Sequence, residues 1–245
     1  MSASLWVIET AERFWEAAGE EEPFPRDLRR AVAYALPLTV VTLPRLRVHA
    51  VDAWLRRRAI HGSPNLADRA LHACLVARSG HGIIFIDGTD SKAEQRFSLA
   101  HELAHFLRDY LQPRRLVAEH LGEAALEVLD GQRPPRPEEQ IHALLSHTRL
   151  GFHVHLMART ETGLVDDRVV DQAERDADLL AFELLAPARC VLRDSSTLTD
   201  DDREQVRQRL QTRFGFPAEP AERYARLLVP ERQVGSSFLE RLRRH

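Results

Sequence analysis

The HExxH motif formed by His101, Glu102 and His105 is the sequence feature that most constrains the fold and chemistry of this chain. Two histidines four residues apart lie on one face of an α-helix, so both imidazoles can reach a single ion. Glu102 then lies beside that ion, where a carboxylate can take a proton from water whose pKa the metal lowers to about 7. The motif predicts half of a zinc site and hydrolysis of the metallopeptidase type. The alternative is a pair of histidines at the edge of the core, satisfied by hydrogen bonds.

The residues before the motif predict that it lies on a helix with a capped N-terminus. The apolar run 83–86 ends in the turn residues 87–90, which is typical of a strand leaving into a turn. Ser91 and Glu94 have the spacing of a capping box. From this start, apolar residues recur at helical spacing, and we expect the helix to end before Tyr110.

A third ligand is expected from a second helix over residues 171–187, where apolar residues again recur at helical spacing. Glu174 and Asp178 are four residues apart and share a face, so Glu174 can bind the metal while Asp178 accepts the second N–H of a ligating histidine. A solvent-facing acidic ridge is the alternative. Other acidic residues here that could replace Glu174 are Asp171, Asp176 and Glu183. Two imidazoles, one carboxylate and an open position suit Zn²⁺ better than Mn²⁺, the other possible ion.

The segment HELAHFLRD, followed by E-x-x-A-D-x-x-A-x-E-L-L-A-P, resembles the ImmA/IrrE family of metallopeptidases. The resemblance is firm over residues 83–109 and 171–187. It implies that His101, His105 and Glu174 bind zinc and that Glu102 is the general base. It also implies an α+β fold, a mainly helical zincin-like domain with a small β-sheet, in a cytoplasmic prokaryotic or phage protein. Members of that family cut a helix-turn-helix repressor and so switch on transcription, in stress responses or mobile-element induction.

The chain departs from the family pattern in two places. Asp178 stands where the family usually has Asn, which keeps a hydrogen-bond acceptor and adds a charge. His105 and Glu174 are 69 positions apart, so we expect an insert at about 110–170. Within it, the pattern predicts helices over 116–129 and 138–150 and a strand over 152–156.

The insert also offers candidates for stabilising the oxyanion that develops during amide hydrolysis. His153 and His155 alternate along the predicted strand and share one face, and that strand could bind substrate backbone by β-addition. Tyr110 is a third candidate, and the sequence does not rank the three. Ordinary polar positions on an exposed strand face are the alternative for both histidines.

The N-terminal third predicts further elements of the same domain. Helices are expected over 6–18, 27–35 and 51–59, and a strand over 38–43. Residues 71–77 are expected to pair with the strand 83–86 as a hairpin.

Composition narrows the remaining classes of protein. Cys74 and Cys190 are the two cysteines, and without a CxxC pair they predict neither structural disulfides nor a cysteine metal site. The longest apolar tract, residues 31–44, contains two prolines and is too short to span a membrane. We therefore expect a cytoplasmic protein.

Residues 199–245 predict a C-terminal helical appendage to a metallopeptidase domain over 1–198. A helix from 200 to about 214, a glycine turn and a helix over 220–228 have the outline of a helix-turn-helix. Between residues 203 and 244 there are 10 Arg against 5 Glu, in a chain of net charge -3. DNA is thus a possible partner, although a helical hairpin packed on the peptidase domain is the simpler interpretation.

Two functions follow from this sequence. The first is a zinc endopeptidase that cuts a regulatory protein, with a helix-turn-helix repressor as its expected partner. The alternative is a transcriptional regulator that binds DNA or a partner on the same fold without proteolysis.

Overall fold

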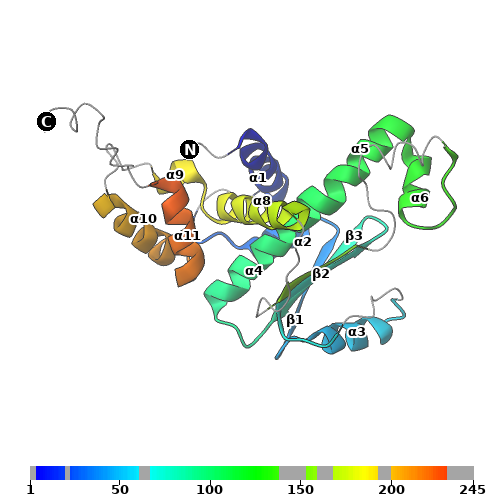
Figure 1. The fold of residues 1–245 in the computed structure, drawn as a ribbon, viewed down its shortest axis with the longest axis horizontal. Coiled ribbons are helices and arrows are strands. Elements are labelled where there is room, and N and C mark those ends of the chain that lie inside the picture. Colours follow the sequence, from blue (N-terminus) through cyan, green and yellow to red (C-terminus); the bar gives the residue numbers. More distant parts are fainter. Residues whose placement is uncertain are drawn as a thin grey trace, which may run out of the picture.

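The computed structural model describes residues 4–19, 23–60, 67–137, 153–158, 168–192 and 200–230, with the backbone alone at 153–158, 168–170 and 200–202. The chain forms a mixed α+β fold, mostly helical, around one small sheet (Figure 1). Its helices are α1 (Leu5–Ala18), α2 (Leu28–Ala35), α3 (Val48–Arg56), α4 (Lys92–His105), the π-helix η1 (Phe106–Leu111), α5 (Gln112–Leu121), the 3₁₀-helix η2 (Glu123–Ala125), α6 (Leu126–Leu129), α8 (Arg168–Leu185), α9 (Ala188–Val191), α10 (Asp200–Thr212) and α11 (Ala218–Leu228). No described helix is both long and apolar enough to cross a bilayer.

Within the described ranges, the sheet has four strands in the order β1-β3-β2-β4. These are β1 (Leu38–Leu43), β2 (Leu71–Arg78), β3 (His81–Asp87) and β4 (His153–Ala158). The predicted hairpin of β2 and β3 is confirmed, and β4 pairs antiparallel with the other side of β2. β1 joins β3 in parallel, which the sequence did not predict. Of the described strands, β4 therefore lies at one edge of the sheet.

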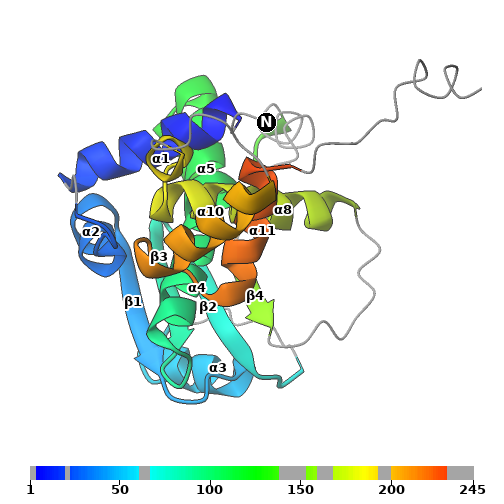
Figure 2. The ribbon, with the colours of Figure 1, turned by 90° about the vertical axis from the view of Figure 1, so that its left-hand side faces the viewer.

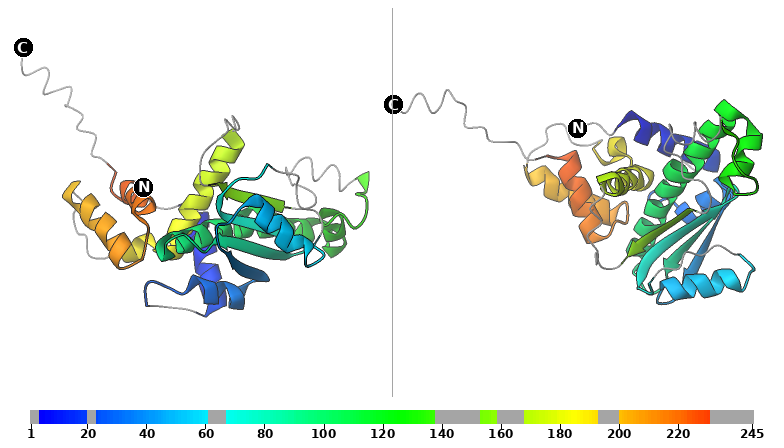
Figure 3. Two further views of the ribbon diagram at one scale, coloured as in Figure 1. Left: turned by 90° about the horizontal axis from the view of Figure 1, so that it is seen from below. Right: turned by 45° about the vertical axis from the view of Figure 1, so that its right-hand side comes forward.

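Side chains of the central strands alternate between two cores, as the period of a strand requires. Leu75, Ile84 and Ile86 belong to the larger core, which they share with helices including α1, α4 and α8. Val76 and Phe85 belong to a smaller core under α3. The sheet is thus covered by α4 on one face and α3 on the other (Figure 3).

Helix α4 begins with the predicted capping box. Ser91 Oγ accepts the Glu94 amide at 3.2 Å, and the Glu94 carboxylate accepts the Ser91 amide at 2.8 Å. Two backbone donors of the first turn are thereby satisfied, which fixes where the helix starts and which residues face the core.

The helix of the motif ends before Tyr110, as expected, because α4 ends at His105. The helical backbone nevertheless continues through the π-helix η1 into α5 and ends at Leu121, which the sequence did not predict. Pro113 lies in the first turn of α5 and has no backbone N–H, so a helical hydrogen bond is missing there, and the wider π turn accommodates the change. The single helix predicted over 116–129 is wrong, because Gly122, with φ of 81°, breaks it before η2 and α6. The helix predicted over 138–150 lies outside the described residues.

The two predicted C-terminal helices are present and packed on the rest of the chain, beside α8 and the start of α4 (Figures 1 and 2). Tyr224 of α11 stacks on Phe182 of α8 with ring centroids 4.6 Å apart. Leu210 and Phe214 belong to the same core as Phe97 of α4. The helical hairpin is thus confirmed. A helix-turn-helix role is not, and the predicted boundary between residues 198 and 199 lies outside the described ranges.

The capping box gives a first prediction. Ser91→Ala should lower the free energy of unfolding of the metal-free protein by about 1 kcal/mol, because it removes the acceptor of an otherwise unpaired helix donor. Urea unfolding followed by circular dichroism measures this. Ser91→Asp is the matched control, because aspartate also caps a helix, and an equal loss in both variants would contradict the assignment.

Candidate metal centre

Three side chains from two helices converge on one point. His101 and His105 of α4 bring their Nε2 atoms to 3.2 Å from each other. Glu174 of α8 places Oε2 3.3 Å from His101 Nε2 and Oε1 3.7 Å from His105 Nε2. Among the described residues, this group has the donor atoms and spacing of a metal site.

The distances fit a tetrahedral ion. Zinc binds imidazole nitrogen and carboxylate oxygen at about 2.0–2.2 Å, so two ligand atoms on a tetrahedral ion lie about 3.3–3.5 Å apart. The separations of 3.2, 3.3 and 3.7 Å are close to that value. Two imidazoles and a carboxylate are also the donor set of catalytic zinc sites that keep a fourth position for water or substrate.

The other nitrogen of each imidazole faces a carboxylate. His101 Nδ1 lies 3.0 Å from Asp178 Oδ1, and His105 Nδ1 lies 2.6 Å from Asp109 Oδ2. An ionised carboxylate only accepts hydrogen bonds, so both Nδ1 atoms must donate. A neutral imidazole has one N–H, so each Nε2 presents a lone pair. Two lone pairs and the Glu174 carboxylate then face one another, an arrangement that a cation between them would stabilise.

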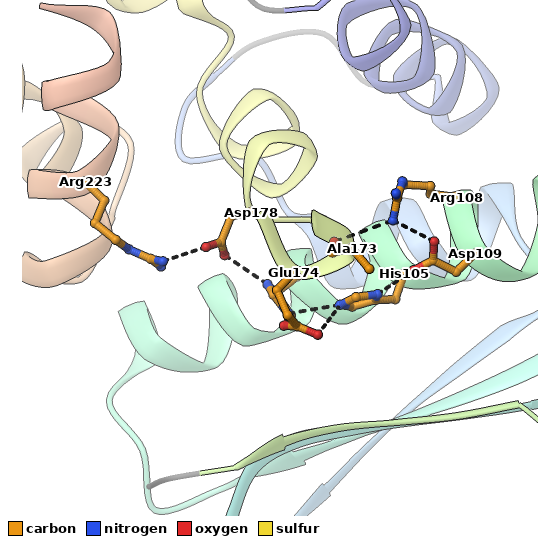
Figure 4. A network of polar contacts seen from close by, with 8 residues as sticks. His105, Arg108, Asp109, Ala173, Glu174, Asp178 and Arg223 are labelled. Carbon is orange, nitrogen blue, oxygen red and sulfur yellow. Dashed lines mark hydrogen bonds and ion pairs between the residues drawn. The ribbon is translucent and has the colours of Figure 1, made fainter. Parts of the chain in front are cut away.

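Each of the two supporting aspartates also meets an arginine (Figure 4). Arg108 donates to Asp109 at 2.7 Å, and its other nitrogen donates to Asp176 of α8 at 2.7 Å. Arg223 of α11 donates to Asp178 at 2.5 Å. Each histidine thus contacts an aspartate, and that aspartate in turn accepts a hydrogen bond from an arginine. Asp176, an alternative ligand in the sequence, pairs with Arg108 instead.

Sequence reasoning missed Asp109, Arg108 and Arg223 as supporting residues. Asp109 had a readable signal, because it lies four residues after His105 and therefore on the same helix face. Arg108 and Arg223 had no such signal, since their partners Asp176 and Asp178 are 68 and 45 positions away.

The centre is buried on the helix side and open at Glu174. His101, Glu102 and His105 are at most 3% exposed, whereas the Glu174 side chain is 42% exposed. Burial raises the pKa of the Cys74 thiol on β2, and the nearby Glu102 raises it further. Glu102 is therefore close to the sheet, in surroundings of low polarity that strengthen its interactions with charge.

The structure does not bring Tyr110 to this cluster. Its hydroxyl accepts the Gly80 amide at 2.7 Å, at the turn between β2 and β3, and its ring stacks on Phe106. Burial raises the pKa of this phenol. The location does not favour a role in stabilising an oxyanion.

Two other acidic candidates also lie apart. Asp171 is exposed on α8. Glu183 is buried near the end of α8, where its carboxylate accepts the Ala188 amide at 3.1 Å and burial raises its pKa. Neither belongs to the group of His101, His105 and Glu174.

For His153 and His155 the structure gives backbone positions. They lie opposite Ala77 and Leu75 of β2, respectively. Leu75 and Ala77 belong to the core that α4 shares, and directly opposed residues of antiparallel strands belong to the same face of the sheet. Both histidines are therefore placed on the α4 face of β4, which is an edge strand among those described.

The cluster predicts the metal content of the purified protein. Elemental analysis should find about one zinc per chain in the wild type and none in His101→Ala or Glu174→Ala, because each loses one of three ligands. Asp171→Ala is the matched control on the same helix and should keep the ion. Loss of the ion in this control, or its retention in Glu174→Ala, would contradict the ligand set.

The hydrogen bond behind His105 gives a separate prediction. Asp109→Ala should weaken zinc binding about 10- to 100-fold, because the acceptor that fixes the imidazole is lost. Competition with a chromophoric chelator measures the affinity. Asp109→Asn keeps an acceptor oxygen and should bind zinc more tightly than the alanine variant. Equal affinities for the wild type and Asp109→Ala would show that this contact does not support the metal.

Comparison with known proteins agrees with this geometry. Residues 51–127 match the family model of the M78 peptidases, described as the IrrE N-terminal-like domain. The match spans β2, β3, α4 and the HExxH motif, and Glu174 and the C-terminal helices lie beyond it. No curated protein sequence matches the chain. Residues 51–127 are therefore similar to the IrrE N-terminal-like domain, which supports the resemblance to the ImmA/IrrE family of metallopeptidases.

Proposed function

We propose that this protein is a zinc-dependent endopeptidase in which His101, His105 and Glu174 hold the ion and Glu102 is the general base. The observation that carries the proposal is the convergence of two Nε2 atoms and one carboxylate, with separations of 3.2–3.7 Å. A structural zinc site is closed by four protein ligands, whereas the residues that the structure describes offer three here, and the exposed Glu174 side chain leaves the site open. An open position beside a buried carboxylate is what hydrolysis requires.

The residues of the chain divide the chemistry between them. Zinc bound at such a site supplies a Lewis acid that polarises a carbonyl and makes water nucleophilic near neutral pH. Glu102 accepts the proton of the attacking water and returns it to the departing amine, and its buried position keeps bulk water from competing. Asp109 and Asp178 hold the imidazoles in the orientation and tautomer that binding requires.

We further propose that the substrate is a polypeptide bound along β4. This strand is paired with β2 on one side, and no described strand pairs with its other side. An extended peptide can add to such an edge through backbone hydrogen bonds. His153 and His155, on the α4 face of β4, are the residues we propose to stabilise the oxyanion, in place of Tyr110.

A regulatory protein, specifically a helix-turn-helix repressor, is the substrate we propose from the family resemblance. Cutting it would alter transcription, in a stress response or a similar induction, inside the cytoplasm. The alternative, direct DNA binding by α10 and α11, has less support because their arginines contact the protein itself. Arg203 donates to Val229 O, Arg209 to Val191 O, and Arg226 to Glu222.

The proposed chemistry predicts the effect of Glu102→Gln. This variant should keep zinc and its folded state but lose hydrolysis by about 100-fold or more, because glutamine cannot accept the proton. A mixed peptide library analysed by mass spectrometry gives the rate and the cleaved bonds. A Glu102→Gln protein that cuts the library as fast as the wild type would refute the mechanism.

The same variant identifies the natural substrate. Labelling of new protein N-termini in cells of the source organism should reveal a cut regulatory protein with the wild type and no such cut with Glu102→Gln. If both proteins change transcription equally and no new terminus appears, the non-proteolytic regulator becomes the better explanation.

A further inference from the structure

The aspartate that supports His101 is itself contacted by a residue of the C-terminal helix α11. The Asp178 carboxylate joins two groups, since Oδ1 accepts from His101 Nδ1 at 3.0 Å and Oδ2 accepts from Arg223 Nη1 at 2.5 Å (Figure 4). The Asp178 side chain is 18% exposed, so water can reach part of its carboxylate.

The guanidinium of Arg223 is itself held by aromatic rings. It lies 5.8 Å from the ring centroids of Phe97 and Phe182, at a distance where cation–π attraction acts. Phe97 is one helical turn before His101 on α4, and Phe182 is one turn after Asp178 on α8. Glu219 of α11 also forms an ion pair with the same guanidinium, with its Oε1 atom 2.9 Å from Arg223 Nε. Arg223 therefore contacts α4 and α8 at the point where both supply the metal centre.

We propose that Arg223 is a positioning residue of the metal centre, which fixes Asp178 against His101 and makes zinc binding depend on the docked α11. This inference rests on the proposed metal site and extends it to a segment beyond the residues that match the family model. The C-terminal helix α11 then supplies a supporting residue to the metal centre from outside residues 51–127.

The sign of the effect separates this role from simple electrostatics. Removing a cation near a dication lowers repulsion, so charge alone predicts that Arg223→Ala binds zinc more tightly. Positioning predicts the opposite, because Asp178 and then His101 lose their fixed orientation. Loss of such a supporting contact lowers metal affinity about 10- to 100-fold.

The experiment measures zinc affinity by chelator competition for the full-length wild type, Arg223→Ala and Arg223→Lys. Arg226→Ala is the matched control, because Arg226 is on the same helix and pairs with Glu222 instead of Asp178. Arg223→Ala should bind zinc at least tenfold more weakly, Arg223→Lys should lie between it and the wild type, and Arg226→Ala should equal the wild type. The absorption spectrum of the Co²⁺ form should also change in Arg223→Ala and stay the same in Arg226→Ala.

A double variant tests whether Arg223 acts through Asp178. If it does, Arg223→Ala should change zinc affinity no further in an Asp178→Ala background. Unchanged or tighter binding by Arg223→Ala and Arg223→Lys, or a full additive loss in the double variant, would overturn the inference. Circular dichroism of the metal-free proteins checks folding, and if Arg223→Ala does not fold, Arg223→Lys carries the comparison. A wild type that binds no zinc would instead refute the proposed function.

Discussion

The contact of two histidines with two aspartates and Glu174 is the interaction for which the rest of this structure is arranged. Asp109 and Asp178 require a donor from each Nδ1, so both Nε2 lone pairs turn toward each other and toward Glu174. That arrangement is stable only if several elements keep their places. The capping box fixes the start of α4, the sheet supports its apolar face, and α8 crosses it with Glu174 and Asp178 one turn apart.

Much of this arrangement was readable from the sequence, because it depends on local spacing. The histidines four residues apart, the capping box and the strand before it all lie within residues 83–105, where helix and strand periods are strong signals. Glu174 and Asp178 followed from the same spacing on a second helix. Such patterns predict which residues share a face of a helix. In this structure the face of α4 with His101 and His105 meets the face of α8 with Glu174.

Other features depend on contacts between distant segments or on irregular backbone, and the sequence did not predict them. The π-helix η1 joins α4 and α5 into one continuous helical stretch, which a regular helical period does not predict. The parallel pairing of β1 with β3 joins strands about 40 residues apart. The arginines of α10 and α11 suggested a basic surface, yet several of them bind carbonyl oxygens and carboxylates of the protein itself.

The residues that support the two histidines lie at different distances from them along the polypeptide. His105 finds its aspartate four positions away, whereas Asp178 is 77 positions after His101 and Arg223 another 45 beyond Asp178. A ribosome adding roughly 5–20 residues per second needs about 2–9 s for those last 45. The centre therefore assembles late in synthesis, and a nascent chain that already displays its HExxH helix does not yet have the support for its first histidine.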